Sequence, residues 1–169
     1  MVKVTVPATS ANLGPGFDTL GVALDLRNTI EMSEIGILDV IIEAEGHGDL
    51  LERPENNMVY QAALKVFDRL SYRPHGLLIK EDVQIPVARG MGSSAAAIVG
   101  GLVAANALVE QMTGRQGLDR EELLRMAVEI EGHPDNVTPA MVGGFTVSCM
   151  DGPAGRSTSG STRPEGSGL

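Results

Sequence analysis

Residues 86–96 read Pro86-Val87-Ala88-Arg89-Gly90-Met91-Gly92-Ser93-Ser94-Ala95-Ala96, and no other segment of the chain is as informative. Two glycines free the backbone, two hydroxyl side chains follow, and a helical run of small residues begins at once. The first N–H groups of a helix lack partners within it and lie at the positive end of its dipole. The segment therefore predicts an anion site at a strand-to-helix turn. The alternative is a tight turn that Ser93 merely caps, and Arg89 beside the glycines favours phosphate.

Secondary structure on both sides of this segment follows from apolar periodicity and turn residues. The expected strands are Val2–Val6, Val22–Glu34, Ile37–Glu45, the start of His75–Pro86, and Val142–Cys149, with a turn-rich stretch at Pro7–Gly21. The expected helices begin after Asn57, at Ser93 (running to about Met112), and after Asp119 (ending near Glu131). Strands and helices mix without regular βαβ repetition, which indicates an α+β domain over residues 1–150.

The last residues, 151–169, have a different composition. They read DGPAGRSTSGSTRPEGSGL, with one aliphatic side chain at the very end. So few apolar groups cannot offset the ordering entropy of the chain. We expect this segment to be a disordered tail.

Composition excludes several classes of protein. The net charge of -9 opposes non-specific binding to nucleic acid. The three lysines, Lys3, Lys65 and Lys80, lie outside glycine-rich segments, so the chain has no P-loop of the G-x-x-x-x-G-K-[ST] type. Cys149 is the single cysteine, and we expect no secretory signal and no apolar run long enough to span a bilayer. These features predict a soluble protein of the reducing cytoplasm.

Two further segments carry candidate ligands. Pro7–Asp18 is dense in Gly, Pro and short polar residues and contains Asn12 and Asp18, although both side chains could simply satisfy turn backbone. Glu129–Pro139 places a carboxylate, an imidazole and an amide on one exposed corner. Mg²⁺ accepts one or two carboxylates together with phosphate oxygens, so a lone Glu near a phosphate loop suffices. A zinc site is not expected, since the three histidines are scattered and the cysteine has no partner at ligand spacing.

Together the three segments resemble the GHMP kinase superfamily and, within it, the homoserine kinases. The stretch P-A-T-S-A-N-L-G-P-G-F-D resembles the first motif in the form found in homoserine kinases, and residues 86–96 fit the superfamily's ATP signature. The stretch E-G-H-P-D-N-V-T-P-A, starting at Glu131, is similar to a third motif and differs from it only at Thr138. The resemblance implies an N-terminal domain with the fold of the second domain of ribosomal protein S5.

The resemblance also implies roles for individual residues. ATP would be bound by the loop and its surroundings, namely Pro86, Arg89, Gly90, Met91, Gly92, Ser93, Ser94 and Ala95. Mg²⁺ would be held by Glu131, with Glu129 as the alternative, and assisted by Ser94 or Ser93. The substrate L-homoserine would face Asn12, Asp18, His133 and Asn136. The catalytic candidates are Asn136 and its neighbour Asp135; because an amide cannot take a proton, the resemblance implies catalysis without a strong protein base.

Length is where the chain departs from these kinases. The resemblance implies a second, C-terminal domain that supplies arginines for the substrate carboxylate, and we expect these 169 residues not to include it. The uncovered apolar surface would favour association into a homodimer. Three hypotheses therefore stand: a homoserine kinase, a catalytically inactive nucleotide-binding fragment, or a GHMP kinase for another small alcohol.

Overall fold

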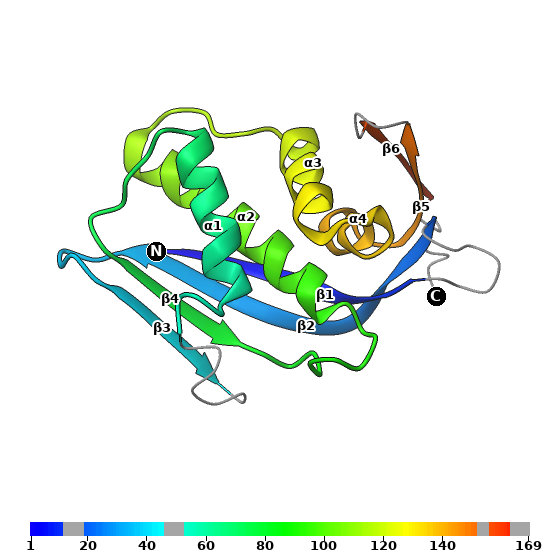
Figure 1. Ribbon diagram of the computed structural model, residues 1–169, viewed down its shortest axis with the longest axis horizontal. Coiled ribbons are helices and arrows are strands. Elements are labelled where there is room, and N and C mark those ends of the chain that lie inside the picture. The colour runs from blue at the N-terminus through cyan, green and yellow to red at the C-terminus, as the bar shows by residue number, and fades with distance from the viewer. Residues whose placement is uncertain (12–18, 46–52, 152–155, 163–169) are drawn as a thin grey trace, which may run out of the picture.

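The computed structural model describes residues 1–11, 19–45, 53–151 and 156–162 (Figure 1). Its elements, in chain order, are β1 (Val2–Ala11), β2 (Leu20–Glu34), β3 (Val40–Glu45), α1 (Met58–Arg69), β4 (Leu77–Asp82), α2 (Ser93–Thr113), α3 (Arg120–Glu131), α4 (Pro134–Val142), β5 (Phe145–Asp151) and β6 (Arg156–Thr162). This mixture of strands and helices confirms the expected α+β class.

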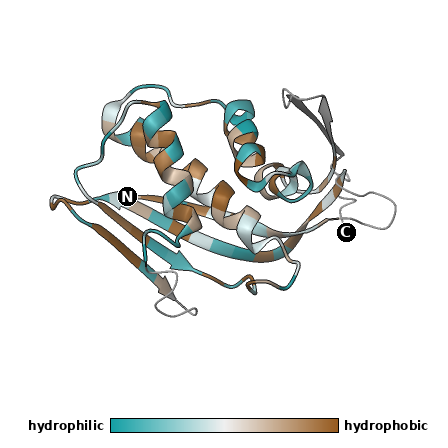
Figure 2. Cartoon of the chain, in the orientation of Figure 1, coloured by the Kyte–Doolittle hydropathy of each residue, from teal (hydrophilic) through white to brown (hydrophobic). Residues whose placement is uncertain are grey.

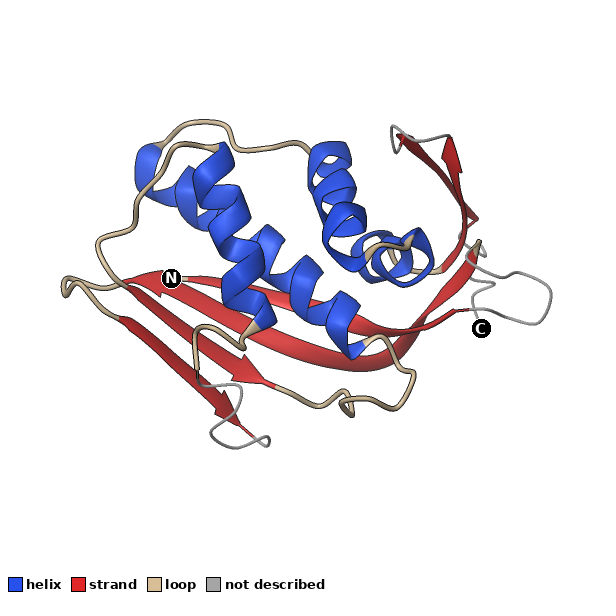
Figure 3. Cartoon of the chain, viewed as in Figure 1, coloured by secondary structure: helices blue, strands red, loops and turns tan. Residues whose placement is uncertain are grey.

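The strands form one sheet in the order β3-β4-β2-β5-β6, with β1 paired to the long strand β2. Pairing is antiparallel throughout, except for the parallel pair β3–β4, whose connection runs through α1. The helices lie together on one face of the sheet (Figure 3). The fold therefore has two layers, with the core between them.

The core follows from strand alternation and from one apolar helix. Ile30 and Met32 on β2 and Ile79 on β4 point to the helical layer and are fully buried. Above them lies α2, in which twelve residues are buried, and Figure 2 shows apolar residues along α1, α2 and the strands beneath them. By length and composition α2 could cross a membrane, contrary to the expectation that no run is long enough. Since 67% of its most apolar window is buried inside the domain, α2 serves here as a core helix.

Local capping signals were predicted correctly. The Asn57 side chain accepts a hydrogen bond from the Tyr60 N–H at 2.7 Å and begins α1. The Asp119 side chain accepts from the Glu122 N–H at 2.8 Å and begins α3. These side chains satisfy backbone donors that each helix leaves unpaired in its first turn.

Several expected boundaries were wrong, among them the strand expected from Val142, which begins at Phe145 because Val142 is the last residue of α4. The first strand continues through Pro7–Ala11, because the backbone there stays paired with β2 as far as Gly21. The third begins at Val40, since Ile37 and Leu38 are exposed in a turn. The corner expected around residues 131–139 contains the additional helix α4, with Pro134 in its first turn, where a missing N–H costs nothing.

Helix α4 packs closely on the sheet. A Cβ on Gly21 of β2 would overlap the Asp135 carbonyl and lie 2.8 Å from Pro139 Cγ. Pro139 has no N–H to donate to the Asp135 carbonyl, which instead abuts Gly21. Only glycine permits this approach, and it fixes the start of α4 against β2.

The C-terminal part differs from the expected disordered tail at residues 156–162. There β6 pairs antiparallel with β5, while residues 152–155 and 163–169 lie outside the described part. On β5 the usual alternation is inverted: Thr146 and Ser148 are fully buried, whereas Phe145 is 37% and Val147 47% exposed. An apolar strip therefore faces outward at this end of the sheet.

Candidate active site

The loop before α2 has the backbone of an anion site. Positive φ angles alternate along it, at Ala88 (58°), Gly90 (70°) and Gly92 (65°). Such alternation turns successive N–H groups toward one side and makes a concave anion-binding nest. The N-cap of α2 is Gly92, with no side-chain capping bond. The first N–H groups of α2 are thus not satisfied by a Ser93 cap, which removes the alternative of a turn capped by that residue.

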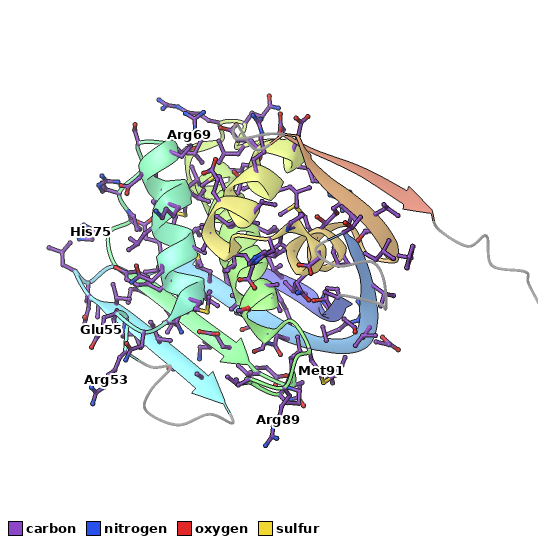
Figure 4. The ribbon with its side chains drawn as sticks, turned by 45° about the vertical axis from the view of Figure 1, so that its right-hand side comes forward. Arg53, Glu55, Arg69, His75, Arg89 and Met91 are labelled. Atoms are coloured by element: carbon purple, nitrogen blue, oxygen red, sulfur yellow. The ribbon has the colours of Figure 1, made fainter. Side chains whose placement is uncertain are left out.

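This loop forms one wall of a pocket of about 650 Å³. Of the predicted site residues, the pocket is lined by Arg89, Gly90, Met91, Gly92, Ser93, Ser94, Glu131 and Asn136. Among the described residues that line the pocket, Arg89 is the one cation. Figure 4 shows Arg89 and Met91 at the lower edge of the domain, with Arg89 pointing away from it.

The remaining predicted residues lie elsewhere. Ala95 is fully buried in the core, and Pro86 and His133 are exposed outside the pocket lining. The catalytic candidate Asp135 is 3% exposed, because α4 packs against the sheet. Asn12 and Asp18 lie outside the described residues.

Ser94 and Glu131 meet in the pocket although 37 residues separate them. Ser94 Oγ donates a hydrogen bond to Glu131 Oε1 at 2.7 Å, joining the start of α2 to the end of α3. Glu129, two residues earlier, instead lines a separate groove with Lys65. In the part of the chain that the structure describes, no three His, Cys, Asp or Glu side chains cluster as a metal cage. One carboxylate and one hydroxyl beside a phosphate loop fit Mg²⁺, which takes its other ligands from phosphate and water.

Asn136 is held by residues of β1 and α4. Its Oδ1 accepts a hydrogen bond from Thr9 Oγ1 at 2.8 Å, and its Nδ2 approaches Asp135 Oδ1 at 3.4 Å. A Cβ on Gly92 would overlap Thr9 Oγ1 and lie 3.2 Å from Asn136 Oδ1. The loop, β1 and α4 therefore converge at one point, which no local pattern in the sequence indicated.

Three buried polar side chains also line the pocket: Asn28, Asn57 and Glu81. Neither Asn28 nor Glu81 was singled out from the sequence, and Asn57 was named only as a helix cap. Asn57 Nδ2 donates a hydrogen bond to Glu81 Oε1. Burial raises the pKa of the Glu81 carboxyl, and the bond from Asn57 opposes that rise. Polar residues on the inward face of a strand are the one signal that could have revealed Asn28 and Glu81.

The two-layer fold and the glycine loop at the start of its central helix define a class of α+β domains. The family model for the GHMP kinases N terminal domain matches residues 57–144, which include the loop, Glu131 and Asn136. The chain belongs to the GHMP kinase family.

Individual relatives narrow this further. The chain is 78% identical over 152 residues to a homoserine kinase of Symbiobacterium thermophilum, covering 89% of this chain and 47% of that protein. A Listeria monocytogenes structure described as a homoserine kinase superposes with a TM-score of 0.78 at 37% identity, over 95% of this chain and 53% of that one. A Methanococcus jannaschii mevalonate kinase shares the fold, with a TM-score of 0.72 at 18% identity, over 97% of this chain and 56% of that one. The chain spans about half the length of the curated relatives it matches.

Proposed function

We propose that this domain provides the ATP-binding side of a homoserine kinase, which transfers the γ-phosphoryl group of ATP to the hydroxyl of L-homoserine. One observation carries the proposal: the anion nest, the Ser94–Glu131 pair and Asn136 share one pocket. The 78% identity to a homoserine kinase supports homoserine over other small alcohols.

In this proposal the loop binds the triphosphate. The N–H groups of the nest and of the first turn of α2 would donate to phosphate oxygens. Arg89 would add positive charge once its side chain turns from its outward position toward the pocket. Glu131 and Ser94 would hold Mg²⁺, which neutralises charge on the phosphates when it is bound. This arrangement stabilises the charge that develops during transfer without a protein base.

The transfer step needs the acceptor hydroxyl in line with the γ-phosphorus. The hydroxyl oxygen forms the new P–O bond while the bond to the β–γ bridging oxygen breaks, and the hydroxyl proton leaves to solvent or a phosphate oxygen. Asn136 would orient this hydroxyl, and Thr9 would hold Asn136. Asp135 is buried and lies outside the pocket lining, so we assign it to positioning Asn136 rather than to proton abstraction. Loss of turnover in Asp135→Asn, with ATP and homoserine binding intact, would argue against this assignment.

The homoserine side of the site rests on the motif resemblance. Asp18 would pair with the substrate ammonium and Asn12 would hydrogen-bond to the substrate, both in the segment outside the described residues. His133 lies at the start of α4, three residues before Asn136, and would approach the same substrate. We place the enzyme in the cytoplasm, where its substrates would be dissolved.

ADP release by the purified chain, with and without L-homoserine, tests the proposal. Homoserine-dependent release supports the kinase. The second candidate is nucleotide binding without turnover, since the loop, Ser94 and Glu131 share the described pocket. ATP binding without homoserine-dependent release would establish that candidate, and release with another small alcohol alone would reassign the substrate.

A further inference from the structure

A buried amide in the middle of β2 connects the sheet to the phosphate loop. Asn28 is 5% exposed, faces the helical layer and lines the pocket. Its Oδ1 accepts two backbone hydrogen bonds, from the Gln84 N–H at 2.9 Å and from the Ile85 N–H at 2.8 Å. One side chain therefore holds two consecutive residues of the segment that leads into the loop.

The two hydrogen bonds to Asn28 lie where backbone pairing between β2 and β4 stops. Backbone pairing between β2 and β4 ends at Thr29 and Asp82, after which the chain leaves the sheet. Asn28 Oδ1 replaces the backbone acceptors that the next residues have lost. Ile85 is fully buried, and the loop starts directly after it. Losing these bonds would leave two N–H groups unpaired near the core, so Asn28 fixes where the loop begins.

The other end of the same amide is available to a ligand. Two N–H donors must face an oxygen, which identifies the atom directed at Gln84 and Ile85 as Oδ1 and leaves Nδ2 on the other side. Within the described ranges Nδ2 makes no hydrogen bond, while the side chain lines the pocket. A nearly buried amide donor with no protein partner is a group that a ligand acceptor can satisfy.

We propose that Asn28 is a positioning residue for nucleotide binding, in which Oδ1 holds the root of the phosphate loop and Nδ2 donates to an acceptor atom of the bound nucleotide. The inference rests on the proposed function, since it takes the occupant of the pocket to be a nucleotide. The acceptor is either a phosphate oxygen or an acceptor of the nucleoside, and both would hydrogen-bond with Nδ2 in the same way.

Two substitutions separate the two ends of the amide. Asn28→Asp keeps an oxygen for Gln84 and Ile85 but replaces the donor with a second, negatively charged oxygen. Asn28→Ala removes both ends. Asn106→Asp is the matched control: Asn106 is also buried and its Oδ1 accepts from the Leu118 N–H at 2.7 Å, but it does not line the pocket.

Calorimetric titration with MgATP and with inorganic tripolyphosphate measures the ligand end. Asn28→Asp should weaken MgATP binding about tenfold or more, because a charge-assisted donor becomes a repelling acceptor, while Asn106→Asp should stay within about twofold of the parent chain. A matching loss with tripolyphosphate assigns Nδ2 to a phosphate, and a loss with MgATP alone assigns it to the nucleoside. Unchanged MgATP affinity in folded Asn28→Asp would overturn the proposal.

Amide hydrogen exchange measures the loop end without any ligand. The Gln84 and Ile85 N–H groups should stay protected in Asn28→Asp and lose protection in Asn28→Ala. Equal protection in both variants would overturn the positioning role. If the parent chain binds neither MgATP nor tripolyphosphate, the proposed function itself fails, and that result is distinct from a failure confined to the Asn28 variants.

Discussion

Replacing Gly92 with alanine should destabilise the domain far more than the same change at Gly90. Both glycines have positive φ, 65° and 70°, so each substitution has the cost of about 1 to 2 kcal/mol that a left-handed conformation imposes on an L-residue. At Gly90 a new Cβ meets nothing within 4 Å. At Gly92 it would overlap Thr9 Oγ1 and lie 3.1 Å from Thr9 Cβ.

The size of the stability loss follows from the displacement of Thr9 that the new methyl group requires. Displacing Thr9 breaks its 2.8 Å bond to Asn136, which is worth about 0.5 to 1.5 kcal/mol. Forcing a methyl group into packed surroundings costs about 1 to 3 kcal/mol more. We therefore expect Gly92→Ala to lower the free energy of unfolding by about 3 to 6 kcal/mol, a large part of the roughly 5 to 15 kcal/mol of a typical domain.

Urea unfolding of the parent chain and both variants gives the comparison. The two variants differ by about 1.5 to 4.5 kcal/mol, so at a slope of about 1 to 3 kcal/mol per molar urea the midpoint for Gly92→Ala should fall at least about 0.5 M below that for Gly90→Ala. A Thr9→Ala background should reduce the cost of Gly92→Ala, because the overlapping oxygen is gone. Equal midpoints for the two glycine variants would refute the argument that Gly92 permits the contact between the loop and β1.

Three further predictions concern single side chains. Thr138 is fully buried and, in the described part, its Oγ1 has no hydrogen-bond partner. Thr138→Val should therefore leave the free energy of unfolding unchanged or raise it by about 1 kcal/mol. A clear decrease of that free energy in urea unfolding would contradict this prediction. Glu131→Gln should raise the half-saturating Mg²⁺ concentration for ATP binding about tenfold or more, whereas Glu129→Gln should not; equal responses would remove Glu131 as the ligand. Burial, aided by the bond to Glu34, raises the pKa of Tyr72 to about 12, above the value near 10 of an unfolded chain. The neutral Tyr72 side chain therefore contributes its full share to the free energy of unfolding below about pH 10, and this contribution is lost as the pH rises to about 12. Tyr72→Phe should flatten that decline and remove the late step in the 295 nm absorbance titration. An unaltered titration would contradict the assignment.

Local chemistry explains which features could be predicted from sequence. The caps at Asn57 and Asp119 act on N–H groups within three residues, and strand alternation repeats every second residue, so both are visible in a single stretch. The glycine turn before α2 was predicted for the same reason, because its glycines and the helix that follows are contiguous.

The sequence predictions failed where tertiary packing determines the local structure. Helix α4 was missed because two prolines lie in a nine-residue helix, whose conformation depends on the close approach of Gly21. The burial of Asp135 could not be predicted, because nothing in its own neighbourhood shows that α4 lies against the sheet.

By itself the amino-acid sequence determined the class of the domain, the anion loop and the set of candidate ligands, because each depends on residue types at short spacing. Only the tertiary structure decided which candidates meet. It brought Ser94 to Glu131 rather than Glu129, joined Thr9 to Asn136 across 127 positions, and added Asn28 to the pocket. Contacts between distant residues depend on how the sheet and helices pack, and no short-range pattern in a single chain encodes that arrangement.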